Sequence, residues 1–235
     1  MPHKVAIIRA SYKGSEPVVE DTWFRAIFQL GRVTDWECKL FSVARRTAQV
    51  ACNHCLEWVE KDEKENGHRF THVIYMDDDV TVDGDTFIKL VNAVDIVHPA
   101  VFALAFFRTA PFRPAIFEGI REDGGKGRTI SFKSIVDYPE NDWIQVDASG
   151  LCAAAFDREV FAMIDKPYFD WGMEGKNAEQ YTPDGFLCNK LAEKGIRLYC
   201  HTGIRVGHLG VPYIINEAQA LPFKEQWICD TSSSD

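Results

Sequence analysis

The first 107 residues alternate between short apolar runs and stretches in which apolar residues recur at helical spacing. This alternation constrains the fold more than any other feature of the chain. Runs typical of buried strands stand at 5–8, 38–43, 71–76 and 101–107. Helical spacing is found at 21–30, 45–61 and 87–93, and the charged stretch 61–68 is typical of a solvated loop. Because strands that alternate with helices pair in parallel through right-handed crossovers, the order predicts an α/β fold with a mostly parallel sheet.

The second half of the chain lacks this regular order. Residues 129–136 and 143–146 suit two strands that pair with each other. Residues 165–183 are typical of a long polar loop, and 203–210 of a shorter one. A helix is expected over 183–194, with Gly195 at its end. We therefore expect a small antiparallel addition to the main sheet, which helices flank.

Composition and charge narrow the class of protein. Hydrophobic residues make up 46% of the 235 residues, which excludes global disorder. No apolar run approaches the roughly 18–20 residues of a membrane span, and the N-terminus lacks the apolar stretch of a secretory signal. We therefore expect a cytoplasmic protein. The net charge of −9 argues against undirected binding to nucleic acid, although the segment 108–133 is locally basic.

The seven cysteines are scattered and mostly lie in apolar surroundings, which is typical of a reducing compartment. Cys52 and Cys55 form a CxxC pair, but no second pair or histidine motif stands at zinc-site spacing. On a helix, positions 52 and 55 share a face. Core packing is therefore the favoured interpretation of this pair.

An acidic cluster follows the third predicted strand without a break. Asp77, Asp78 and Asp79 come directly after Thr71–Met76. Ligands of parallel α/β sheets bind outside the carboxyl ends of the strands. Adjacent carboxylates repel one another unless a cation compensates them, and one or two carboxylates suffice to hold Mg²⁺ or Mn²⁺ beside substrate phosphates. The pattern therefore favours a metal site over a solvated turn.

The ordered set of motifs resembles the nucleotide-sugar glycosyltransferases with the glycosyltransferase A fold, of the small family-2-like type found in bacteria and phages. Val73–Val80 resembles their DxD segment. Four further pieces fall in the family's order: 41–47, 146–156, 182–188 and 205–210. The resemblance spans residues 4–210 and implies a single Rossmann-like domain over 1–230. Its nucleotide-sugar-binding half would be 1–107, its acceptor half 108–230, and 231–235 would be a frayed tail.

The resemblance also implies roles for individual residues. Asp77, Asp79 and His208 would hold Mn²⁺ or Mg²⁺, and through it the diphosphate of a donor, expected to be a UDP-sugar. The residues expected to bind the nucleotide-sugar are Ala10, Ser11, Tyr12, Arg45, Arg46, Asp77 and Asp78. Which of the two arginines faces the donor stays open.

On the acceptor side, Asp184 would be the catalytic base that accepts the proton of the attacking hydroxyl. It is preceded by Pro183 where the family often carries Glu, so a helix-start carboxylate is the alternative interpretation, and inverting or retaining chemistry stays open. Ser149, Gly150 and Trp171 are expected to contact the acceptor. That acceptor would be a saccharide, a protein or a modified DNA base, in the host cytoplasm if the chain is phage-encoded.

Two other classes of function stay open. One is a nucleotide- or carbohydrate-binding module without turnover. The other is a nucleotidyltransferase, which also uses carboxylate-bound Mg²⁺. A nucleotidyltransferase usually has a Gly-rich, basic loop after its first strand, whereas residues 11–16 here hold one Gly and one Lys.

Overall fold

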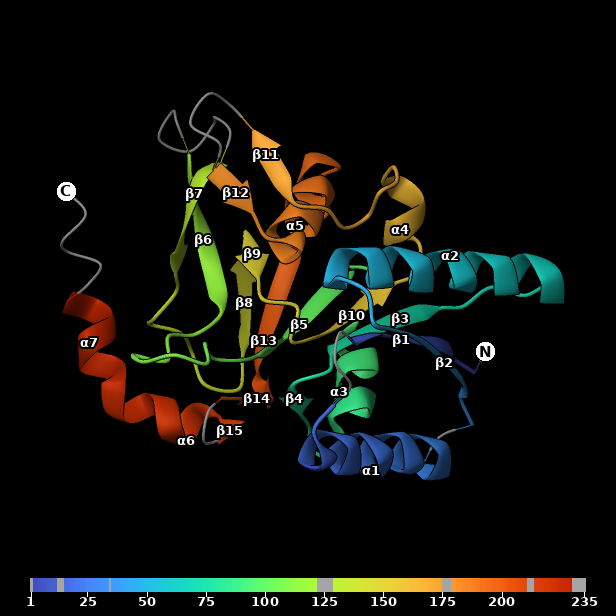
Figure 1. Ribbon diagram of the computed structural model, residues 1–235, viewed down its shortest axis with the longest axis horizontal. Coiled ribbons are helices and arrows are strands. Elements are labelled where there is room, and N and C mark those ends of the chain that lie inside the picture. Colours follow the sequence, from blue (N-terminus) through green and yellow to red (C-terminus); the bar gives the residue numbers. More distant parts are fainter. Residues whose placement is uncertain are drawn as a thin grey trace.

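A seven-stranded sheet forms the centre of the protein in the computed structural model, which describes residues 2–11, 15–33, 35–121, 129–174, 179–210 and 214–229. The strand order is β2-β1-β3-β10-β5-β13-β8 (Figure 1). The strands are β1 (Lys4–Ser11), β2 (Glu37–Ala44), β3 (His72–Asp77), β5 (Ala100–Leu104), β8 (Trp143–Val146), β10 (Ala153–Asp157) and β13 (Leu198–Arg205). All run in one direction except β10 and β8. The expected α/β fold with a mostly parallel, Rossmann-like sheet is confirmed.

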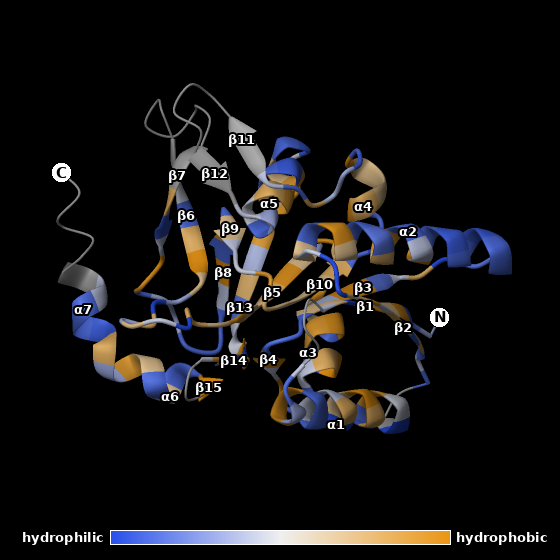
Figure 2. Ribbon diagram, viewed as in Figure 1, coloured by the Kyte–Doolittle hydropathy of each residue, from blue (hydrophilic) through white to orange (hydrophobic). Residues whose placement is uncertain are grey.

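Helices cover both faces of this sheet, because side chains alternate along each strand between two apolar layers. One layer packs under α2 (Ala48–Asn66), α4 (Val160–Met163) and α5 (Pro183–Glu193). The other packs against α1 (Pro17–Val33) and α3 (Thr86–Ala93). Figure 2 shows apolar strands at the centre and a hydrophilic outer end of α2. Cys52 and Cys55 are buried on the inner face of α2, which confirms core packing for this pair.

Small antiparallel sheets surround the carboxyl edge of the central sheet. One contains β15 (Ile214–Ile215), β14 (Gly207–Leu209) and β4 (Val80–Thr81), and another contains β7 (Thr129–Ser134), β6 (Ile116–Arg121) and β9 (Ala148–Ser149). A hairpin joins β11 (Gly172–Glu174) to β12 (Glu179–Tyr181). The C-terminal segment of α6 (Glu217–Ala220), a 3₁₀ turn (Leu221–Phe223) and α7 (Lys224–Cys229) packs on the core through buried Trp227.

Several local expectations from the sequence are wrong. Strands β7 and β8 do not pair with each other, because β7 pairs with β6 and β8 with β13. The segment 203–210 is not a loop but the end of β13 followed by β14. The segment 165–183 is likewise not wholly a loop, since it contains the hairpin β11–β12.

The charged stretch 61–68 is also misjudged as a loop, since α2 continues to Asn66 before Gly67 adopts a left-handed conformation. Asp62 and Glu63 are buried there and paired with Lys39 and Arg158, so tertiary ion pairs stabilise the last turns of the helix. Within the described residues, no helix combines the length and apolar character that a membrane span requires. The expected frayed tail, 231–235, lies outside the described residues.

Candidate functional site

The carboxyl ends of the parallel strands bring the predicted residues to one edge of the central sheet. Ala10 near the end of β1 is in register with Asp77 at the end of β3, and Ser11 with Ala44 at the end of β2. Strand β5 ends at the same edge, next to the segment that carries Arg108. This edge of an open α/β sheet is where ligands bind.

Asp77 lies at the centre of this edge and is held by its neighbours. The Tyr75 hydroxyl donates to its Oδ1, and its backbone N–H donates to the Cys152 carbonyl over 3.1 Å. Burial raises the pKa of Asp77 well above its ordinary value, and the nearby charges of Asp184, Asp79 and Asp78 raise it further. The carboxylates at this edge are therefore close enough to destabilise one another's ionised forms.

Asp79 and His208 form a second element of the edge. Strand β14 pairs with β4, and His208 Nε2 lies 3.5 Å from Asp79 Oδ1. The other ring nitrogen, Nδ1, is 2.9 Å from the Phe106 carbonyl, which can only accept, so Nδ1 carries the proton in this arrangement. Burial acts to raise the pKa of Asp79, but His208 and Arg108 outweigh it and lower the pKa.

Asp184 approaches the same edge from the first turn of α5. Thr182 caps this helix by accepting from the Gly185 N–H, and Pro183 occupies the next position. Asp184 Oδ2 accepts from the Leu151 N–H over 3.3 Å. Burial raises the pKa of Asp184 to about 6. The structure therefore places this carboxyl beside Asp77, although the two are far apart in the sequence.

The edge carries part of a ligand set that a hard divalent cation could use. Among the residues that the structure describes, no three His, Cys, Asp or Glu side chains converge as a complete metal site. Mg²⁺ and Mn²⁺ sites that bind phosphates keep positions for substrate and water, and one or two carboxylates suffice. A metal-binding histidine also commonly donates its other N–H to a carbonyl, as His208 does to Phe106. Asp79 and His208, whose Oδ1 and Nε2 atoms lie 3.5 Å apart, could therefore offer two ligands to such an ion, and Asp77 as a third ligand stays a prediction.

The residues expected on the donor side lie along β1 and just beyond β2. Ala10 and Ser11 are buried, whereas Tyr12 lies outside the described residues. Arg45 and Arg46 are both exposed at the edge. The Arg45 N–H donates to the Ser11 carbonyl over 2.8 Å, and Arg45 has a φ of 60°, which a residue with a side chain seldom adopts. Backbone strain of this kind is concentrated at functional sites.

The residues expected on the acceptor side differ in exposure. Ser149 is buried, and its hydroxyl lies within hydrogen-bonding distance of the Ala115 and Gly150 carbonyls. At Gly150 a Cβ would lie 3.2 Å from the Cβ of Ala115, so the close approach of the two backbones favours glycine. Trp171 is 45% exposed, just before β11. Of the three, Trp171 has the most accessible side chain.

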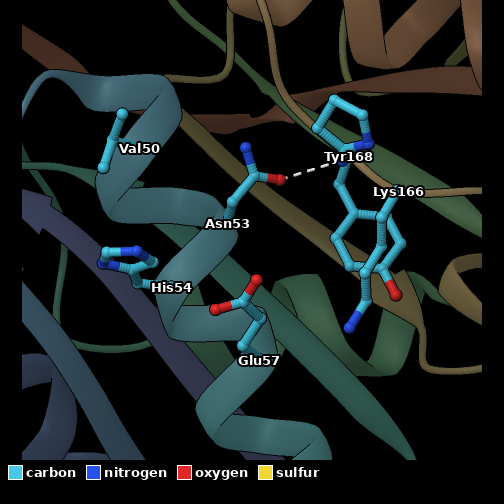
Figure 3. A pocket seen from close by; sticks show the side chains of 7 residues that line it. Val50, Asn53, His54, Glu57, Lys166 and Tyr168 are labelled. Carbon is cyan, nitrogen blue, oxygen red and sulfur yellow. Dashed lines mark hydrogen bonds between the residues drawn. The ribbon is translucent and has the colours of Figure 1, made fainter.

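Asn53 fixes the segment that leads to Trp171. Its Oδ1 accepts from the N–H groups of Tyr168 (2.8 Å) and Phe169 (3.2 Å), and its Nδ2 donates to the Phe169 carbonyl (2.7 Å). Figure 3 shows Asn53 on α2 facing Tyr168 across a hollow that His54, Glu57 and Lys166 also line. The Phe169 ring stacks on Tyr75 at 6.0 Å between centroids. This contact connects the segment to the edge of the sheet that carries Asp77, Asp78, Asp79 and Asp184, which we call the acidic edge.

Three contributors to the site were missed from the sequence. Arg108 pairs with Asp79 at 2.7 Å, Tyr75 holds Asp77, and Asn53 holds the segment before Trp171. Arg108 had a signal, because it is the first basic residue after the run 101–107. Tyr75 and Asn53 had none, since their roles depend on contacts that only the folded chain creates.

Comparisons with known proteins bear on the fold. No model of a protein family matches the chain, and neither does any curated protein. Among solved structures, A197 from STIV matches with a TM-score of 0.51 and 16% identity, covering 88% of this chain and 85% of that one. At this identity the likeness shows a shared fold alone.

Two further matches have lower TM-scores. A 4-diphosphocytidyl-2C-methyl-D-erythritol synthase from Anaerococcus prevotii DSM 20548 gives 0.43 at 13% identity, over 97% of this chain and 96% of that one. A nucleoside-diphosphate-sugar pyrophosphorylase from Vibrio cholerae RC9 gives 0.36 at 13% identity, over 94% and 80%. Both scores are too low to indicate a function for this chain.

Proposed function

We propose that the protein is a metal-dependent glycosyltransferase that moves a sugar from a nucleotide diphosphate sugar, in the first instance a UDP-sugar, to a hydroxyl acceptor. One observation carries the proposal: Asp77, Asp79, His208 and Asp184 meet at the carboxyl edge of the sheet although they come from three separate parts of the chain. Such a set provides both ligands for a cation and a carboxylate that can take up a proton.

On the donor side, Asp77, Asp79 and His208 would hold Mn²⁺ or Mg²⁺. When bound, the ion would neutralise the charge that grows on the departing diphosphate. The nucleotide would lie over Ala10 and Ser11, which are buried at the end of β1. Arg45 and Arg46 are exposed and would meet ribose or phosphate oxygens, which a guanidinium group matches in geometry.

On the acceptor side, Asp184 would take the proton from the attacking hydroxyl. A base works best when its pKa lies near the working pH, and burial brings the pKa of Asp184 to about 6. The N–H of Leu151 holds the carboxyl in place from one side. Trp171 would provide an apolar face for the acceptor, and Ser149 and Gly150 would contact it as well.

The described parts of the segment 108–133, residues 108–121 and 129–133, give little support to a nucleic-acid acceptor. Phe112, Phe117 and Phe132 are partly buried and pack against the core, so only part of each side chain is accessible to a base. Phe107 is 41% exposed, but its ring contacts Phe117. A saccharide or protein hydroxyl therefore agrees better with the described residues.

The test is a donor screen. The protein is mixed with Mn²⁺ and a panel of UDP-, GDP- and CMP-sugars, and released nucleotide and the shift in melting temperature are both measured. We expect release from at least one donor, and its loss in Asp79→Ala. Asp83→Ala is the matched control, because Asp83 is an exposed carboxylate just past β4 and should retain release.

The other two classes predict different products. A nucleotidyltransferase would release pyrophosphate from a nucleoside triphosphate and a sugar phosphate. A binding module would show the shift in melting temperature without release from any donor, with or without candidate saccharide acceptors. No shift with any donor would refute the proposed function.

A further inference from the structure

Arg108 contacts Asp79, one of the carboxylates expected to bind the cation, through the oxygen that does not face His208. Its Nη1 lies 2.7 Å from Asp79 Oδ2, while Asp79 Oδ1 faces the His208 ring. The guanidinium is thus a positive group in direct contact with a carboxylate of the acidic edge. The Arg108 side chain is 56% exposed and that of Asp79 is 26% exposed, so the contact between them is open to solvent.

The backbone around Arg108 is anchored, but its side chain extends toward solvent. Before it, Phe106 is buried, and its carbonyl accepts from His208. After it, the Phe112 N–H donates to Thr109. The turn is also fixed by buried Trp227, whose Nε1 donates to the Pro111 carbonyl over 2.6 Å. A change at this position therefore needs only a rotation of the Arg108 side chain.

The balance of charge at the edge indicates when that rotation would occur. Asp77, Asp78, Asp79 and Asp184 lie close together, and a nucleoside diphosphate would add negative charge to them. A divalent cation at Asp79 and the guanidinium of Arg108 would compete for the same carboxylate. The released guanidinium would then be next to the diphosphate, whose oxygens it matches as a bidentate donor.

We propose that Arg108 is a cation that exchanges with the metal: it neutralises Asp79 in the metal-free chain, and after displacement it binds the donor diphosphate. This inference rests on the proposed function, since it assumes that Asp79 holds the metal. An exposed ion pair contributes little to stability, so the exchange meets little resistance. Arg108 is thereby assigned two successive partners and a direct contact with the substrate.

The test measures two dissociation constants by isothermal titration calorimetry, that of Mn²⁺ alone and that of UDP in saturating Mn²⁺. In Arg108→Ala, Mn²⁺ alone should bind about fivefold more tightly, because its internal competitor is gone. UDP should bind about tenfold more weakly, because its guanidinium partner is gone. Arg108→Lys keeps the positive charge but lacks the paired N–H donors of the guanidinium group. Its Mn²⁺ affinity should therefore stay near that of the wild type, and its UDP affinity should be intermediate.

Arg69→Ala is the matched control, since the Arg69 side chain is 50% exposed and pairs with Glu159 away from the edge. It should leave both constants unchanged. If either constant in Arg108→Ala equals that of the wild type while Asp79→Ala abolishes Mn²⁺ binding, the exchange is refuted and the metal site stands. If the wild type binds no Mn²⁺ even with UDP present, the metal-dependent function is refuted together with the exchange.

Discussion

The two ends of β3 accommodate buried charge in opposite ways. Near its amino end, Arg158 Nε and Nη2 donate to the two carboxylate oxygens of Glu63 over 3.0 and 2.9 Å, and the Phe70 N–H donates to the same carboxylate over 3.0 Å. At its carboxyl end, burial raises the pKa of both Asp77 and Asp184, and the charge of Asp184 raises the pKa of Asp77 further. We call the end at Glu63, where a cation pairs with the buried carboxylate, the compensated end, and the end at Asp77, where burial and like charges raise the pKa, the uncompensated end.

This difference separates a structural use of charge from a functional one. A buried pair with all its hydrogen bonds made has no need of a further partner. Buried carboxylates that lie close together repel one another when ionised, and a bound cation or proton removes this repulsion. Such groups are typical of functional sites. The acidic edge is therefore the part of β3 that is suited to a ligand.

The largest expected effect comes from breaking the compensated end. Arg158→Met leaves the Glu63 carboxylate buried without its cation, and we expect it to lower the free energy of unfolding by about 3–5 kcal/mol. Urea denaturation followed by circular dichroism measures this loss. A loss below about 1 kcal/mol would show that Glu63 takes up a proton or water in place of Arg158 at little cost.

The next effect concerns the uncompensated end and depends on pH. Because burial raises the pKa of Asp184 to about 6 from 3.8, the folded chain binds this proton more tightly than the unfolded chain. The stability that this group contributes is complete below its unfolded pKa and is lost as the pH rises through its folded pKa. Relative to the wild type, Asp184→Asn should therefore gain about 2 kcal/mol of unfolding free energy between about pH 4 and pH 7.

This comparison is made by urea denaturation in a chelating buffer at several pH values. Any constant offset between the two proteins reflects the altered start of α5 and does not bear on the prediction. A difference that stays flat across the range would show that Asp184 is not buried in its charged form.

A cation should reduce the contrast between the two ends. At tenfold excess over its dissociation constant, Mn²⁺ should stabilise the folded chain by about 1.4 kcal/mol. For a chain of this size that corresponds to a rise in melting temperature of about 3–5 °C. Asp79→Ala should abolish the rise in a thermal scan, whereas Asp83→Ala should keep it. An equal rise in all three proteins would place the ion elsewhere.

The same contrast explains which features could be predicted from the sequence. The acidic edge was predictable because Asp77 directly follows an unbroken apolar strand, so the local pattern places it at the carboxyl end. The end of α2 was not, because Glu63 is stabilised by Arg158, which lies 95 residues further along the chain. A charged run therefore has the same local pattern whether or not a distant partner buries it.

Strand order posed the same difficulty. The apolar stretch that forms β10 was visible, but its antiparallel insertion between β3 and β5 depends on pairing between segments far apart in the chain. The contact between Arg108 and Asp79 follows from that insertion and from the end of β5, and no spacing in the sequence indicates it. The resemblance to a known family supplied His208 and Asp184, which periodicity alone does not single out.

The smallest expected effect comes from an exposed Arg–Glu pair, which has the same chemical groups as the buried pair and differs from it in burial. Arg69 and Glu159 form a guanidinium–carboxylate pair, as Arg158 and Glu63 do. The side chains of Arg69 and Glu159 are 50% and 61% exposed, whereas those of Arg158 and Glu63 are 6% and 10% exposed. Water screens the exposed pair and solvates each partner when the other is removed, so Arg69→Met should cost less than about 0.5 kcal/mol in the same urea experiment. A cost as large as that of Arg158→Met would mean that the chemistry of the pair, and not its burial, sets the stability of charge in this protein. The contrast between the two ends of β3 would then need another cause.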